Sequence, residues 1–113
     1  MRIVINRRHG GFGLSRAAFL RLRELGCAAA LAEPDFGEFY SDGSGPRSRM
    51  SETFGDGVER NDPLLVQVVE EMSDAANGEH ASLEIIEVPD DVAWQVEEYD
   101  GFEHIAEKHR TWP

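Results

Sequence analysis

The chain has 113 residues, a formal net charge of −11 and a hydrophobic fraction of 41%. This length supports one compact core and is too short for two, so we expect a single domain spanning residues 1–113. The 22 acidic residues argue against a protein that binds duplex nucleic acid, because such a protein needs a broad basic surface to displace phosphate counterions.

The first apolar run is IVI, which is too short for the hydrophobic region of a signal peptide, and no run approaches the ~20 apolar residues of a membrane span. We therefore expect a cytoplasmic protein with no membrane partner. Cys27 is the only cysteine, which excludes an internal disulfide, and its thiol is expected to be buried and inert.

Residues 2–6 (RIVIN) predict a short buried strand, because β-branched side chains are bounded by polar ones. Ser15 is then placed to cap a helix. The apolar stripe of that helix is formed by Ala18, Leu22 and Leu25. Either the helix ends at Gly26, or it continues through Gly26 to residues 28–30. Residues 33–61 predict a long irregular segment, anchored by its aromatic side chains.

The clearest helix begins after Asp62, a capping residue, with Pro63 at its first position. Its apolar stripe consists of Leu65, Val68, Val69, Met72 and Ala76, and Asn77-Gly78 predicts its end.

Two strands, over residues 82–88 and 92–99, flank Pro89-Asp90-Asp91, which favours an antiparallel hairpin between them. Asp100 and Glu103 match a capping box and predict a last helix over residues 101–110. Together these elements predict an α+β fold in which two or three helices pack on a small, mainly antiparallel sheet.

The segment NRRHGGFGLS, residues 6–15, is the first candidate site. Glycines between a strand and a helix let an anion approach backbone N–H groups, and basic side chains next to them add charge. The candidate ligand-binding residues here are Arg7, Arg8, His9, Gly10, Gly11 and Phe12. The alternative is a tight structural turn that needs positive φ, because the glycines match no known phosphate-loop spacing.

The C-terminal EKHRTWP is the second candidate site. An arginine fork could bind a phosphate while the aromatic side chain stacks on a base. The candidate residues are Lys108, His109, Arg110 and Trp112. The alternative is that these cations only stabilise the end of the predicted helix, with His109 half-buried on its apolar stripe.

Other chemical motifs are incomplete. HGGF is similar to the oxyanion loop of esterases, but the chain has no G-x-S-x-G nucleophile. His104 and His109 are five residues apart rather than four, and the acidic loops lack the spacing of a calcium site. We therefore expect no catalytic residue, no metal site and no cofactor.

Three segments together resemble a family of small phage-encoded proteins, the first Thoeris anti-defence family: RIVIN…GGFGLS, NDPLLVQVVEEM…ANG and LEIIEVPDDVAWQVEEYDGFEHIAEKHRTW. The resemblance implies a sponge that binds cyclic ADP-ribose-type immune signals, and in some cases cyclic oligonucleotides, without cleaving them. It also implies a homodimer or a dimer-based higher oligomer, with ligand contacts from Arg110 and from the arginines before GGFG.

Two other functions stay open. The acidic middle of the chain could imitate a polyanion and block a basic host defence protein. A less favoured alternative is an enzyme that degrades the same ligands, with His9 or His104 as the base.

Overall fold

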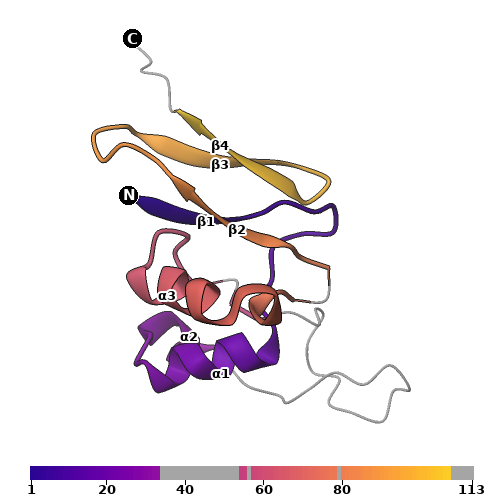
Figure 1. Ribbon diagram of the computed structural model, residues 1–113, viewed down its shortest axis with the longest axis vertical. Helices are drawn as coiled ribbons and strands as arrows, with labels where there is room; N and C mark the ends of the chain where they lie inside the picture. Colours follow the sequence, from indigo (N-terminus) through magenta and orange to yellow (C-terminus); the bar gives the residue numbers. More distant parts are fainter. Residues whose placement is uncertain (34–53, 56, 79, 108–113) are drawn as a thin grey trace.

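The computed structural model describes residues 1–33, 54–55, 57–78 and 80–107. These residues form three layers: helices, a two-stranded sheet, and a β-hairpin on the other side of that sheet (Figure 1). The elements are β1 (Arg2–Asn6), α1 (Arg16–Glu24), α2 (Ala28–Ala32), α3 (Pro63–Met72), a short 3-10 helix η1 (Ser73–Ala76), β2 (Leu83–Glu87), β3 (Trp94–Tyr99) and β4 (Phe102–Glu107). The predicted α+β class is confirmed.

Strand β1 lies at the centre of the layers and is buried, as predicted. Val4 belongs to the main core, which β1 shares with the helices. Ile3 and Ile5 point to the opposite face, because side chains alternate along a strand, and they are 0% and 1% exposed. The hairpin formed by β3 and β4 lies against β1 on that side of the sheet.

Helix α1 begins where the sequence predicts. The Ser15 hydroxyl accepts a hydrogen bond from the Ala18 N–H at 3.2 Å, and Gly26, with φ of 84°, follows the end of the helix. Residues 28–32 then form the separate helix α2. The Phe19 ring stacks on Phe54 at a centroid distance of 4.6 Å, which joins α1 to the loop that precedes α3.

Helix α3 also begins where its capping residues predict. The Asp62 carboxylate accepts a hydrogen bond from the Leu64 N–H at 2.8 Å, and Pro63 occupies the first turn. The helix ends at Met72, and η1 extends the chain to the predicted stop at Asn77. Cys27 is buried, as expected, with Sγ 4.0 Å from a carboxylate oxygen of Asp62.

The predicted hairpin around Pro89 is wrong. Strand β2 pairs instead with β1 in antiparallel register, with Ile3 opposite Ile86. The segment around Pro89 carries the chain from this sheet to the outer hairpin (Figure 1). The physical reason is that β1 is buried, so its backbone N–H and C=O groups need hydrogen-bond partners, which β2 provides.

The predicted helix over residues 101–110 is also wrong, because residues 102–107 form β4. Asp100 and Gly101 have φ of 51° and 87°, so they make a two-residue turn that leads directly from β3 into β4. Glu103 therefore caps no helix. Among the described residues, no helix has the length and apolar character needed to cross a membrane.

Candidate functional site

The first turn of the chain packs against the tip of the β3–β4 hairpin. The Gly10 N–H donates to the Asp100 carbonyl at 3.1 Å. A Cβ placed on Gly101 would lie 2.7 Å from the Gly10 nitrogen and even closer to that of Gly11. Glycine is required at this contact because two backbones approach too closely for any side chain.

Asn6, at the end of β1, links the turn to the hairpin. Its side-chain Nδ2 donates to the Arg8 carbonyl at 2.6 Å and to the Gly101 carbonyl at 2.7 Å. Its Oδ1 accepts a hydrogen bond from the Ser82 N–H at 2.9 Å. Asn6 is 0% exposed, so this network satisfies a polar side chain that would otherwise be costly to bury.

A buried ion pair covers the edge of β1 that faces away from β2. Glu103 Oε1 accepts the Asn6 backbone N–H at 2.8 Å, and both carboxylate oxygens bind the Arg60 guanidinium. The Arg60 carbonyl accepts the Val4 N–H at 2.8 Å. The Arg60 guanidinium also lies 3.6 Å from the centre of the Phe12 ring. Phe12, a predicted ligand-binding residue, therefore packs against this ion pair.

Basic and aromatic side chains from the turn and the hairpin gather at the surface. The Arg7 guanidinium carbon lies 4.9 Å from the centre of the Phe102 ring. The His9 ring lies 5.3 Å from Phe102 and meets Tyr99 edge-on at 6.5 Å. Tyr99 is 80% exposed. We name these four residues, Arg7, His9, Tyr99 and Phe102, the cation–aromatic patch.

Arg8 adds a further cation in the chain between Arg7 and His9. Its side chain is exposed and engages in no ion pair within the described part of the chain. Arg7 has only a long ion pair with Glu84, at 3.7 Å. Both arginine side chains are therefore exposed, and Arg7 lies against the half-buried Phe102 ring.

The backbone of the turn does not offer the predicted anion cradle. The Gly10 N–H is already used by Asp100, and the Gly11 nitrogen is covered by Gly101. A shallow hollow of about 340 Å³ at this point is bordered by the carboxylates of Glu98 and Asp100, which would repel an anion. Positive charge at this site comes from side chains alone.

The second candidate cluster, Lys108, His109, Arg110 and Trp112, lies outside the described residues. The last described residue, Glu107, pairs with Trp94, whereas Phe102 pairs with Tyr99 at the other end of the hairpin. Five residues along a strand span about 17 Å. Glu107 therefore lies about 17 Å along β4 from Phe102.

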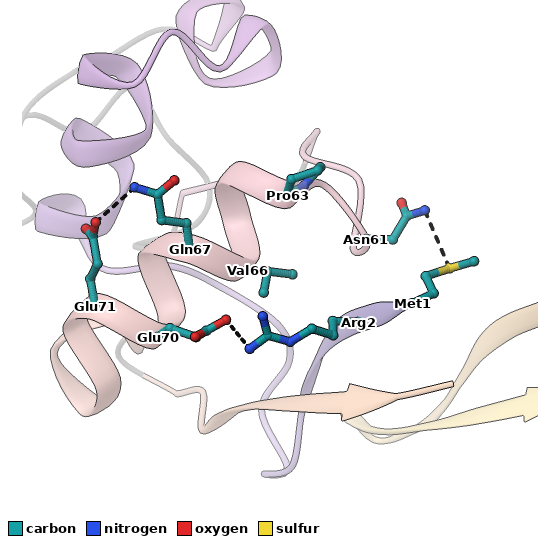
Figure 2. A pocket seen from close by; sticks show the side chains of 8 residues that line it. All are labelled: Met1, Arg2, Asn61, Pro63, Val66, Gln67, Glu70 and Glu71. Carbon is teal, nitrogen blue, oxygen red and sulfur yellow. Dashed lines mark hydrogen bonds and ion pairs between the residues drawn. The ribbon is translucent and has the colours of Figure 1, made fainter. Parts of the chain in front are cut away.

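A second hollow, of about 500 Å³, lies between β1 and α3. Figure 2 shows Arg2 reaching from β1 to an ion pair with Glu70 on α3. Glu71 is held by Arg21 and Gln67, whose hydrogen bonds lower the pKa of its carboxyl group. The charges around this hollow are paired within the chain, and none of the predicted site residues that the structure describes, Arg7 to Phe12, lines it.

Tyr99 and Phe102 are the site residues that the sequence analysis missed. Phe102 lies in the segment predicted as the last helix, and Tyr99 is the last residue of a predicted strand. The signal that could have found them is Asp100-Gly101, a two-residue hairpin sequence that places the residues before and after it opposite each other. Among the described residues, no three His, Cys, Asp or Glu side chains are grouped as metal ligands.

No known protein family, no curated protein and no solved structure matches this chain.

Proposed function

We propose that this protein binds a small anionic nucleotide-type ligand at the cation–aromatic patch and sequesters it without cleaving it. The observation that carries the proposal is the arrangement of Arg7, Phe102, His9 and the exposed Tyr99 around one surface. Exposed rings stack on bases, and guanidinium groups bind phosphate through charge-assisted hydrogen bonds.

Sequestration is favoured over cleavage by the chemistry of the patch. Hydrolysis of a phosphate or glycosidic bond needs an activated nucleophile or a positioned acid–base pair. The patch instead combines an arginine, two aromatic rings and one imidazole that contacts those rings. These groups support binding by stacking and charge.

The ligand class follows the family resemblance. In this proposal the ligand is a cyclic ADP-ribose-type immune signal or a cyclic oligonucleotide, and the protein acts in the cytoplasm of an infected bacterium. The protein is a homodimer or a dimer-based higher oligomer, because a chain of this size leaves exposed aromatic area to cover.

Isothermal titration calorimetry with cyclic ADP-ribose isomers, cyclic dinucleotides and cyclic trinucleotides tests the proposal. At least one ligand should bind below roughly 1 μM, which is about −8 kcal/mol. Chromatography of the denatured complex should then recover the ligand intact. Absence of binding across the panel contradicts the proposal, and recovery of a cleaved ligand replaces sequestration with an enzymatic function.

A charge-reversal control separates binding at the patch from binding elsewhere. Arg8→Glu should weaken the interaction and reduce its dependence on salt, because Arg8 is exposed and makes no internal ion pair in the described part of the chain. Arg2→Glu, at the other end of β1, should leave the affinity unchanged. Equal effects of both changes would place the ligand outside the patch.

A further inference from the structure

We propose that Asn6 is the positioning residue of the cation–aromatic patch. Its buried side-chain amide holds the first turn and the hairpin tip at the separation at which Arg7 and His9 meet Phe102. The ligand-binding part of this inference rests on the proposed function, whereas its structural part does not.

The two carbonyl groups that Asn6 binds belong to residues directly beside the patch. Arg8, whose carbonyl accepts at 2.6 Å, lies in the chain between Arg7 and His9. Gly101, whose carbonyl accepts at 2.7 Å, directly precedes Phe102. One side chain thus links residues that are 93 positions apart in the sequence and fixes both halves of the patch.

The chemistry of these contacts requires an asparagine. The site uses two N–H donors, toward the two carbonyls, and one oxygen acceptor, toward the Ser82 N–H. Aspartate supplies the acceptor but has no donors when ionised, and serine supplies only one donor. Because Asn6 is 0% exposed, water cannot replace a lost hydrogen bond without rearrangement.

The link matters because the described ladders join β1 only to β2, and β3 only to β4. In the described part of the chain, three hydrogen bonds join the turn to the hairpin tip: from the Asn6 side-chain amide to the Gly101 carbonyl, from the Gly10 N–H to the Asp100 carbonyl, and from the Asn6 backbone N–H to the Glu103 carboxylate. Of these three, the bond to Gly101 is the one made by a side chain, and the same side-chain amide also binds the Arg8 carbonyl within the turn.

The experiment compares Asn6→Asp with Asn77→Asp in the full chain. Asn77 is a matched control, because its Oδ1 accepts the Leu83 N–H at 2.8 Å and an aspartate can still do so. The readouts are the affinity for cyclic ADP-ribose, measured by calorimetry, and the nuclear Overhauser contact between the His9 and Phe102 rings. Both are taken where the Ile3 and Ile86 amides remain protected from exchange, which shows that the variant is folded.

We expect Asn6→Asp to lose the His9–Phe102 contact and to bind cyclic ADP-ribose at least tenfold more weakly. Asn77→Asp should retain the contact and the parent affinity. A folded Asn6→Asp variant that keeps the ring contact overturns the proposal. If cyclic ADP-ribose does not bind the parent protein, the proposed function fails for this ligand, and the ring contact alone still decides the role of Asn6.

Asn6→Ser provides a second variant that removes one donor without adding a charge. In a folded Asn6→Ser protein the His9–Phe102 contact should weaken, and the affinity should fall less than in Asn6→Asp. If neither variant retains protected Ile3 and Ile86 amides, Asn6 is required for folding as a whole and the positioning role is overturned.

Discussion

The Arg60 guanidinium binds both oxygens of the Glu103 carboxylate, at 2.5 and 2.8 Å, and so joins the loop before α3 to β4. The side chain of Glu103 is 7% exposed, whereas that of Arg60 is 23% exposed. The same carboxylate accepts the Asn6 N–H. The ion pair thus holds the hairpin against β1, where the described strands β1 and β4 share no backbone hydrogen-bond ladder.

Glu103→Gln should destabilise the protein by about 3 kcal/mol, because it removes one partner of a buried ion pair. This value is at the lower end of the usual range for such losses, since Arg60 retains some contact with water. Chemical denaturation in urea measures this loss. Glu97→Gln is the control, since the exposed Glu97–His104 pair should contribute about 1 kcal/mol or less. Equal losses in the two variants would show that the Arg60–Glu103 pair does not hold the hairpin.

Gly101→Ala should be strongly destabilising, by at least about 2 kcal/mol. An alanine at φ of 87° costs about 1–2 kcal/mol by itself, and its Cβ would also collide with the Gly10 and Gly11 backbone. Thermal unfolding measures the effect. Gly57→Ala, where a Cβ meets no atom within 4 Å, should change stability by about 0.5 kcal/mol or less. Full stability of Gly101→Ala would argue against the close approach of the turn and the hairpin.

Tyr99→Ala should separate ligand binding from stability. With 80% of Tyr99 exposed, its removal should change the unfolding free energy by about 0.5 kcal/mol or less. Loss of one stacking ring should weaken ligand binding by about 1–3 kcal/mol. Leu31→Ala on α2, also at an exposed apolar residue, should affect neither. An unchanged affinity in Tyr99→Ala would remove this ring from the site.

Glu71→Gln should alter the pH dependence of stability. Hydrogen bonds from Arg21 and then from Gln67 lower the pKa of Glu71 below its usual value of 4.5 in the folded protein. The contribution of this carboxylate is therefore present above pH 4.5 and is lost as the pH falls through the lower folded pKa. The melting temperatures of the parent and the variant should differ at neutral pH and converge in acid.

A double-mutant cycle checks the cause of that difference. If the Arg21–Glu71 pair is responsible, Arg21→Gln should show the same convergence in acid, and adding Glu71→Gln to it should remove little more stability at neutral pH. Additive losses at pH 7 would show that the two side chains act independently.

Local signals were sufficient wherever neighbouring residues decide the structure. Ser15 and Asp62 cap their helices through hydrogen bonds to N–H groups two or three residues ahead, so the sequence alone located both starts. The β-branched residues of β1 likewise predicted a buried strand. Asp100 carried two competing local signals, a capping box and a hairpin turn, and the turn is the one that formed.

The pairing of strands depended on residues far apart in the chain. Proximity favoured a hairpin between β2 and β3, but β1 needs a partner along its whole length and finds it about 80 residues away in β2. Glu103 shows the same limit: its carboxylate serves Asn6 and Arg60, which no local pattern relates to it.

By itself, the sequence determined the α+β class, the helix starts, the buried first strand and the presence of exposed arginines beside a glycine turn, because each depends on residues close together in the chain. Only the tertiary structure brought Tyr99 and Phe102 to Arg7 and His9, and it also placed the hairpin over the glycines. The physical reason is that the patch depends on how the hairpin docks on β1. The Asn6 amide stabilises this docking by a hydrogen bond to a residue more than ninety positions away. The Arg60–Glu103 ion pair stabilises it between residues more than forty positions apart.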